Sequence, residues 1–427
     1  MTSTLLFEAI AVNNVSAVQT FATAETVNVR DSSALTPLSR AAIRGSVEII
    51  KILIDAGGKV DAENCEWPPL VLACQLNKLE AVKALVEAGA DLNLNNNFDT
   101  PPPLHSAAAA GCLEIIQFLI DRGANVDLME TANLSTPLFA AARQGQLASV
   151  ELLLKNKADP NFADINEWTP LQIASLYGHL EIVKTLINHK ASVAAVNNRP
   201  STALNMAAET NNKEIVQLLL DHKAPVDVID WKEETPLFSA VKHNNPELVQ
   251  LLIKHGSNVD FKSATDEEGP LLWASQNGFT KVASILLETG ANADPALTDG
   301  TSALTLASMH GHLEIVRLLV DHGANVNHQN QRRVAPIHVA SSKGHVEIIR
   351  FLLEKGAPVN LVGNSLLIPI HSAAMKGRLD AIKLLVENGA DIFARDCDGL
   401  TPLDLAEESG QVEVVEYLTP LMKDSEE

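Results

Sequence analysis

Apolar residues recur along this chain in pairs of short clusters that are separated by a turn. In residues 302–327, which are representative, the first cluster ends at Gly311 and the second lies between Leu313 and Val320. The spacing within each cluster predicts a helix of roughly 8 to 10 residues, and the second helix is apolar on more than one face. Because helices this short do not persist alone, we expect each pair to be stabilised by stacking on its neighbours.

The residues at the ends of the clusters are typical signals for starting and stopping helices. The Ser302 hydroxyl can cap the first helix, and at several equivalent positions the capping residue is followed by proline, which fits the first turn. Gly311 can close the first helix in a left-handed conformation, and Gly323 can close the second. Each unit is therefore predicted to be a helix-turn-helix.

The units repeat with an almost constant period. The tripeptide Thr-Pro-Leu begins at residues 36, 136, 169, 235 and 401, and degenerate copies of the same slot begin at 68, 102, 202, 269, 302, 335 and 368. The intervals of 32 to 34 residues leave no room for an inserted domain. We expect an N-terminal capping unit at residues 1–35, eleven units at 36–400, and a C-terminal capping unit with an acidic tail at 401–427.

Both ends have the polar character expected of capping units. Asn13 and Asn14 separate two helices predicted at residues 5–11 and 15–21. Pro420 is expected to stop the last helix before the acidic tail. With Met1 at the start, we expect the chain to be an entire protein.

Two motifs carry a resemblance to a known family. Thr-Pro-Leu-His is matched fully or nearly in most units, and Gly-Ala-Asp/Asn-Val-Asn follows the second helix, as at residues 89–93, 123–127 and 389–393. The chain resembles the ankyrin-repeat family over essentially its whole length. The resemblance implies an all-α fold, a curved right-handed solenoid of helix-turn-helix units whose connecting loops, here called fingers, form short β-hairpins. It also implies that partners are held on a concave side, made by the fingers and the exposed face of the first helices.

Composition and charge narrow the functional classes. Aromatic residues make up only 4% of the chain, which favours close packing of helices. A net charge of −21 argues against nucleic acid, which needs a concentrated basic stripe. The same charge favours a partner segment with basic residues, although many cytosolic proteins are simply acidic. No apolar stretch is long enough to span a membrane.

The cysteines and the N-terminus bear on the compartment. Cys65, Cys74, Cys112 and Cys397 lack C-x-x-C spacing and are interpreted as reduced thiols. Residues 1–14 carry no signal for secretion. We expect a monomer in the cytoplasm, with the nucleus as the alternative.

Thirteen histidines raise the question of a metal or catalytic site, but most occupy repeated positions. They lie in the Thr-Pro-Leu-His slot, after the turn glycine, or at the end of the second helix: His105, His338 and His371; His179, His312 and His345; His189, His222, His255 and His322. The family resemblance implies that such histidines form hydrogen bonds to turns. We predict no metal site, because the pair His310 and His312 lacks further ligands at a suitable spacing.

Motifs for catalysis are also missing from the sequence. There is no nucleophile elbow, zinc-protease helix, phosphate-binding loop or kinase signature, so we predict no catalytic residue, no cofactor and no enzymatic activity. Residues 396–399, Asp-Cys-Asp-Gly, resemble part of a calcium loop but lack its remaining oxygen ligands. They are interpreted as a turn.

Binding is predicted instead from side chains that vary between units on the concave side, at the two positions after the small-residue pair of the first helix and in the fingers. The predicted partner-binding residues are Trp168, Leu176, Tyr177, Trp231, Lys242, His243, Gln276, Asn277, Met309, His310 and Met375. Trp168 and Tyr177 are the preferred anchors. The alternative for Trp67, Trp168 and Trp231 is packing between fingers, and for Trp273 it is packing in the core. The predicted function is a protein-protein interaction module, with a multi-partner scaffold or assembly chaperone as the alternative.

Several units depart from the expected glycine pattern. Lys157, Lys190 and Lys223 replace the glycine after the second helix, which predicts softer units in the middle of the chain. The finger glycine is kept only at Gly300 and Gly399, so the other fingers are expected to use different turns.

Three fingers are unusual in their apolar content. Those that contain Phe98 and Met129 are enlarged. Leu366 and Leu367 are adjacent in a third, which predicts a contact point or self-association patch unless they pack locally. The units from the fifth to the tenth are the expected working surface.

Overall fold

The chain folds into α-helices joined by turns. The computed structural model describes residues 2–61, 67–95, 100–263 and 268–423, and within these ranges it contains no β-strand. The helices are α1 (Thr2–Ala11), α2 (Val15–Phe21), α3 (Pro37–Arg44), α4 (Val47–Asp55), α5 (Pro69–Gln75), α6 (Leu79–Glu87), α7 (Pro103–Ala110), α8 (Leu113–Asp121), α9 (Pro137–Arg143), α10 (Leu147–Lys155), α11 (Pro170–Leu176), α12 (Leu180–Asn188), α13 (Ala203–Glu209), α14 (Lys213–Asp221), α15 (Pro236–Lys242), α16 (Pro246–Lys254), α17 (Pro270–Asn277), α18 (Thr280–Glu288), α19 (Ala303–His310), α20 (Leu313–Asp321), α21 (Pro336–Lys343), α22 (Val346–Glu354), α23 (Pro369–Met375), α24 (Leu379–Glu387), α25 (Pro402–Glu408) and α26 (Val412–Lys423).

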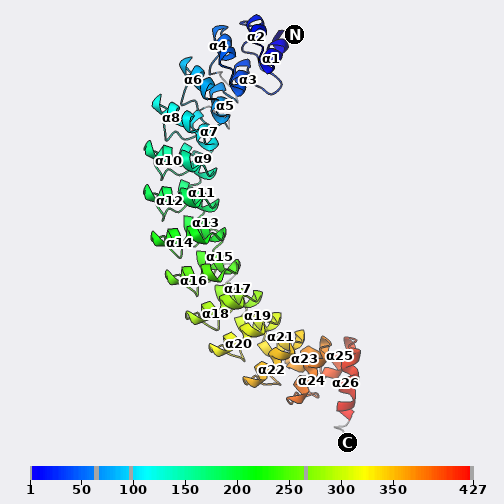
Figure 1. Cartoon of the computed structure of the whole chain (residues 1–427). Helices are drawn as coiled ribbons and strands as arrows, with labels where there is room; N and C mark the ends of the chain where they lie inside the picture. The colour runs from blue at the N-terminus through cyan, green and yellow to red at the C-terminus, as the bar shows by residue number, and fades with distance from the viewer. Residues whose placement is uncertain (1, 62–66, 96–99, 264–267, 424–427) are drawn as a thin grey trace. The chain divides into compact units, whose positions relative to one another are not determined.

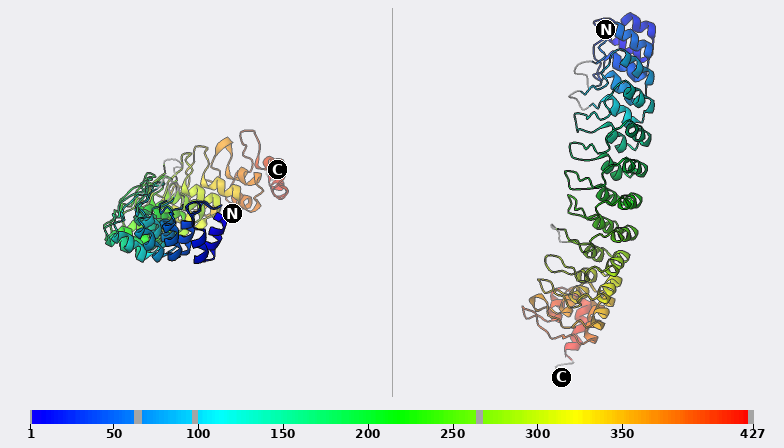
Figure 2. Two further views of the ribbon diagram at one scale, coloured as in Figure 1. Left: turned by 90° about the horizontal axis from the view of Figure 1, so that it is seen from above. Right: turned by 90° about the vertical axis from the view of Figure 1, so that its left-hand side faces the viewer.

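Two compact units divide the chain. Residues 1–231 contain α1 to α14, and residues 232–427 contain α15 to α26. Within each unit every odd-numbered helix packs on the next odd-numbered helix and every even-numbered helix on the next even-numbered one, so two helix layers run side by side (Figure 1). The fingers project from one side of these layers in each unit (Figure 2). The all-α solenoid architecture is confirmed.

The core lies between the two layers of each unit. In α3 and α4, Leu38, Ala41, Ile49, Ile50 and Leu53 are at most 1% exposed. Alanine after the leucine lets neighbouring first helices approach closely, and the branched residues of the second helix fill the space between the layers. Burial of these side chains supplies the stability that helices of seven to nine residues lack on their own.

The predicted caps are present, and one prediction about the chain end is wrong. The hydroxyl of Thr36 accepts a hydrogen bond from the Ser39 amide at 3.1 Å, and Thr136, Thr169, Thr235 and Ser302 cap their helices in the same way. Pro420 does not stop the last helix, because α26 continues through it to Lys423. A proline in an exposed final turn removes only one backbone hydrogen bond, so the helix can continue past it.

The expected β-hairpins are not formed in the described fingers. Their only strand-like pairing is an isolated bridge between Ala296 and Ser302. Fingers are instead closed by one or two backbone hydrogen bonds, such as Asp164 N–H to Trp168 O and Glu167 N–H to Asp164 O, both at 2.9 Å. The Asp164 carboxylate also accepts the amides of Asn166 and Trp168, each at 2.9 Å, and so competes with a ladder of backbone pairs.

The expectation that fingers without glycine use different turns is wrong for six fingers, although Pro200 takes the same place in another finger and cannot adopt this conformation. Gly300 and Gly399 have φ of 79° and 80°, and the residues at the same position in six other fingers are left-handed as well: Ala34, Leu134, Glu167, Glu233, Arg333 and Leu366. The turn keeps its conformation because the backbone is held on both sides. A side-chain oxygen two or three residues earlier accepts a backbone amide of the turn, and the capped start of the next helix follows it. Glycine lowers the strain of this turn but does not define it.

The three lysines that replace the glycine after the second helix take over its conformation. Lys157, Lys190 and Lys223 have φ of 67°, 68° and 63°. That these units are softer stays a prediction. Leu366 is 53% exposed whereas Leu367 is half-buried, so only the first is available as a contact point. Phe98 lies outside the described residues.

The state of the thiols and the length of the helices are two further features of the described residues. Cys74 and Cys112 are buried, Cys397 is exposed, and all three are free, while Cys65 lies outside the described residues. Burial raises the pKa of both buried thiols. Among the described helices, none has the length and apolar character needed to cross a bilayer.

Candidate partner-binding surfaces

The histidines of the Thr-Pro-Leu-His slot are parts of the scaffold. His338 Nδ1 accepts the Ala335 amide at 3.1 Å, and its Nε2 donates to Leu361 O in the next finger at 2.9 Å. His371 makes the equivalent bonds to Ile368 N and Ala394 O. Both nitrogens are therefore used, and the ring must be neutral with its proton on Nε2. Burial lowers the pKa of both histidines, which keeps them in this form.

His105 differs because the residue at the start of its slot is Pro102, which has no amide proton. The His105 Nε2 still donates to Ser135 O, but its Nδ1 is buried and has no hydrogen-bond partner among the described residues. The ring is 1% exposed. Burial lowers the pKa of His105 to about 4, although the bond to Ser135 acts in the opposite direction.

The residues after the turn glycine connect consecutive units. His179, His312 and His345 each donate from Nε2 to the carbonyl two residues before the turn glycine of the preceding unit, at 3.1 to 3.3 Å. Each of these rings also lies against that glycine, so a Cβ on Gly278 would come within 2.6 Å of His312. The described residues contain no group of three or more side chains that could hold a metal ion. These histidines therefore link units, as the family resemblance implied.

The predicted partner-binding residues of the first helices fall into two classes. The first position after the small-residue pair is half-buried, and the second is exposed. The half-buried residues are Leu176, Lys242, Gln276, Met309 and Met375, and the exposed residues are Tyr177, His243, Asn277 and His310. A row of exposed side chains beside half-buried ones, of which Leu176, Met309 and Met375 are apolar, can accept a ligand chain.

The two preferred anchors do not form a single spot. Tyr177 is 50% exposed and stacks on His179 with ring centres 6.2 Å apart. Trp168 is half-buried and precedes α11, whereas Tyr177 directly follows that helix. They therefore flank opposite ends of this helix, whose seven residues span about 10 Å.

The sequence analysis predicted Trp231 but missed the apolar finger surface to which it belongs. Ile165, Val196, Ile229 and Trp231 are 58%, 47%, 47% and 52% exposed, and together they are called the fingertip strip. They come from three consecutive fingers of residues 1–231. The signal was present, since these residues lie four or six positions before the slot, where most other units are polar or charged.

Contacts between the fingers hold this strip together. Ile165 N–H donates to Asn133 O at 2.8 Å, and Asn198 N–H donates to Asn166 O at 3.2 Å. The Arg199 guanidinium lies 5.3 Å from the centre of the Trp231 ring. Trp231 is thus partly packed between fingers, as the alternative proposed, yet half of its surface remains accessible.

A second aromatic cluster contains Lys242, a predicted partner-binding residue, and Trp273, for which packing in the core was the alternative. Trp273 packs edge-to-face on Phe238 at 6.0 Å, and Lys242 Nζ lies 5.0 Å from the Trp273 ring and 5.2 Å from the Phe238 ring. Lys242 also forms an ion pair with Glu234. Trp273 is half-buried, so it is neither fully in the core nor a free anchor. Its indole Nε1 is buried without a partner among the described residues.

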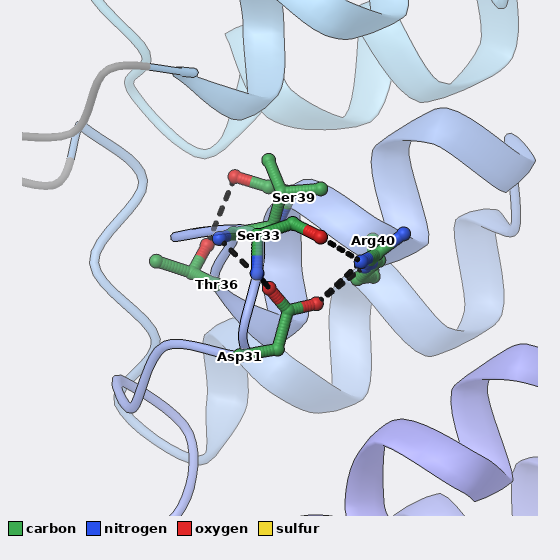
Figure 3. A network of polar contacts seen from close by, with 6 residues as sticks. Asp31, Ser33, Thr36, Ser39 and Arg40 are labelled. Carbon is green, nitrogen blue, oxygen red and sulfur yellow. Dashed lines mark hydrogen bonds and ion pairs between the residues drawn. The ribbon is translucent and has the colours of Figure 1, made fainter.

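The first repeat carries a polar network beside a cleft of about 390 Å³ that is lined by α1 and α3. Arg40 Nε donates to Asp31 Oδ2 at 2.6 Å, and Asp31 Oδ1 accepts the amides of Ser33 and Leu35 (Figure 3). Partial burial acts to raise the pKa of Asp31, but the bonds from Arg40 and the amides outweigh it and lower the pKa. The charge of Arg40 is therefore balanced by Asp31, which holds the side chain in place. Asp31 also fixes the Leu35 amide directly before the capping residue Thr36.

Comparison with known proteins agrees with this architecture. A family model described as ankyrin repeats (3 copies) matches residues 6–96, 104–197, 138–230, 191–263, 226–299, 271–362 and 337–426. No curated protein sequence matches the chain. The overlapping matches reach nearly from end to end and follow the helix pairs. The chain belongs to the ankyrin-repeat family.

Proposed function

We propose that this protein binds a segment of a partner protein on the surface formed by its first helices and fingers. Ankyrin repeats are generally protein-protein interaction modules and are typically non-enzymatic. The observation that carries the proposal for this chain is the fingertip strip, in which consecutive fingers expose one apolar side chain after another. Exposed apolar side chains in a row are characteristic of partner sites.

The strip is large enough to contribute useful affinity. Trp231 is 52% exposed, and covering the remaining ring would contribute about 2 to 3 kcal/mol before the costs of association. Arg199 already fixes one side of the ring, so little side-chain freedom is lost when a partner binds. Ile165 and Val196 would extend the contact along the neighbouring fingers.

The residues predicted from the sequence extend the proposed surface. Leu176, Tyr177 and Trp168 belong to the same compact unit as the fingertip strip. Lys242, His243, Gln276, Asn277, Met309, His310 and Met375 would form a separate contact region in residues 232–427. We propose that the segment at the strip carries basic residues, because the exposed Glu167 lies in the same finger as Ile165 and the chain has a net charge of −21.

We further propose that the protein is a monomer without catalytic activity, located in the cytoplasm with the nucleus as the alternative. Residues 1–35 and 401–427 would serve as its capping units. Free, buried thiols at Cys74 and Cys112 support a reducing compartment.

The alternative is a scaffold that holds several proteins. It is favoured by the division into two compact units and by a cleft of about 460 Å³ on the second-helix side, which Leu180, Lys184 and Leu218 help to line. The stoichiometry of the complex distinguishes the two. One partner per chain supports the interaction module, and two or more different partners bound at once support the scaffold.

The test is capture of partners from native extract, followed by affinity measurements with the purified partner. Trp231→Ala is expected to weaken binding by about 2 kcal/mol, roughly 30-fold. Tyr177→Ala tests the first-helix surface in the same assay. Val412→Ala is a matched control, because Val412 is 66% exposed on α26 and far along the chain from the fingertip strip. Equal affinity for Trp231→Ala, Tyr177→Ala and the control would reject the proposed surface.

A further inference from the structure

The first helices of residues 232–427 expose a row of nitrogen-containing side chains on an otherwise acidic protein. His310, Lys343 and Lys376 occupy the second position after the small-residue pair in three consecutive units, and all three are exposed. The residue after each turn glycine adds His312, His345 and Arg378. These six residues are called the cationic strip.

Hydrogen bonds place the members of the strip next to one another. His345 Nε2 donates to Met309 O at 3.2 Å, which brings its ring to the end of α19 beside His310. Arg378 Nε donates to Ser342 O at 3.2 Å, beside Lys343 at the end of α21. The rings of His310 and His312 stack with centres 6.1 Å apart. The strip is therefore continuous over the ends of α19, α21 and α23.

The strip lacks internal counter-charges. The side-chain ammonium groups of Lys343 and Lys376 form no ion pair or hydrogen bond with the residues that the structure describes. Partial burial lowers the pKa of His310, and His312, Lys343 and His345 lower it further. Glu407 and Glu408, exposed at the end of α25, are the carboxylates that follow the strip on the next first helix. Like charges held this close favour an anionic ligand.

Helix capping does not explain the strip. Basic side chains near a helix C-terminus interact well with its carbonyls, and this accounts for Arg378 and for the ring of His345. The equivalent exposed positions in residues 1–231, however, are Arg44, Leu76, Ala110, Gln144, Tyr177 and Thr210. Only one of these six residues, Arg44, is a cation, and the helices that carry the other five still form. A basic side chain in three consecutive units, at 310, 343 and 376, is therefore not a requirement of the fold.

We propose that the cationic strip binds an acidic segment of a partner protein. Neighbouring packed helices lie about 8 to 10 Å apart, and an extended chain covers about 10 Å in three residues. A segment with a carboxylate at about every third position would place one anion at each unit. Polar contacts fit this ligand better than nucleic acid, because the strip has no aromatic residue other than histidine for base stacking, and the chain's charge of −21 repels polyphosphates.

This inference rests on the proposed protein-binding function, but it concerns a different surface from the fingertip strip. The ligand of the cationic strip is acidic, whereas the segment proposed for the fingertip strip is basic. Protonation of His310 would strengthen the attraction. Because its pKa is lowered and bound carboxylates favour the charged imidazole, affinity should rise as the pH falls below about 6.5. It should fall as salt is added.

The test uses the full chain and a labelled twelve-residue peptide, Glu-Ser-Gly repeated four times, in fluorescence anisotropy at low salt. Lys343→Glu with Lys376→Glu is expected to weaken binding by at least ~10-fold, which is about 1.4 kcal/mol. Lys254→Glu with Lys281→Glu is the matched control, because these exposed lysines lie on α16 and α18 and the change in net charge is identical. The control should stay within about 2-fold of the unchanged protein. Circular dichroism checks that both variants are folded.

Three outcomes would overturn the proposal. These are no binding of the peptide at low salt, equal loss in both double variants, or stronger binding of a peptide with lysine in place of glutamate. Stronger binding of a twelve-residue oligothymidine would assign the strip to single-stranded nucleic acid instead. If Trp231→Ala still weakens partner capture while the glutamate peptide fails, only this inference is lost. If the peptide binds and no partner depends on Trp231, the proposed fingertip site is lost.

Discussion

The buried ring of His105 makes the stability of the first compact unit sensitive to acid. The ring is 1% exposed, its Nε2 donates to Ser135 O, and its Nδ1 faces Pro102 at a position where other units supply an amide proton. Protonation would place a charge and an additional unpaired N–H in the core. Both effects oppose protonation in the native state and neither exists in the unfolded chain.

The size of the effect follows from the two pKa values. Burial lowers the pKa of His105 from an ordinary value of 6.5 to about 4. Between these values the unfolded chain binds a proton that the native state does not, so the free energy of unfolding decreases as the pH falls. The loss is about 2 kcal/mol at pH 5 and approaches about 3 kcal/mol below pH 4.

His105→Gln is the variant that isolates this contribution. At the equivalent position Gln172 donates from Nε2 to Ala195 O and Ser201 O, both at 2.9 Å, so glutamine fits the slot without a titrating ring. The quantity to measure is the free energy of unfolding by urea at pH 7.5 and at pH 5. Hydrogen exchange in α7 reports on this unit. The unchanged protein should lose about 2 kcal/mol more than His105→Gln over this range.

Two further variants show whether the reasoning about this ring is right. His222→Gln changes an exposed histidine and should leave the pH dependence unaltered. Pro102→Thr restores the amide proton that His338 and His371 accept from their slot residues and adds a capping hydroxyl like that of Thr136. It should stabilise the unit by about 1 kcal/mol after the loss of proline rigidity. Parallel pH profiles for His105→Gln and the unchanged protein would refute the account.

Two further predictions concern the left-handed turns. Gly278→Ala should destabilise the chain by about 2 to 3 kcal/mol, because φ is 77° and the new Cβ would lie 2.6 Å from His312. Gly290→Ala is the control, because φ is 95° but no atom lies within 4 Å of the new Cβ. It should cost only about 1 kcal/mol in the same thermal melts. Equal losses in the two variants would contradict the contact with His312. Lys190→Gly and Lys223→Gly should each stabilise their unit by about 1 kcal/mol and slow hydrogen exchange there, and uniform protection of all units before the change would show that the lysines soften nothing.

Short-range features of the sequence predicted the local structure well. These features are the slot residue, the proline after it and the turn glycine. They lie at the two ends of one helix, so their hydrogen bonds form inside one unit. Even the orphan nitrogen of His105 could have been predicted, since Pro102 lies in the same slot. The fingers were predicted less well. Side-chain acceptors such as Asp164 hold a left-handed turn without glycine, so the missing glycine was misleading.

The binding surfaces depended on contacts between units. Ile165, Val196 and Trp231 lie about thirty residues apart in the sequence, and only the stacking of fingers makes them one strip. Lys242 has the same place in its unit as Leu176, yet a neighbouring Trp273 and Glu234 enclose it. The sequence by itself determined the period, most of the helix ends and the family, because these rest on patterns repeated within each unit. Only the tertiary structure decided which side chains stay exposed, because exposure depends on the neighbour that packs against each unit.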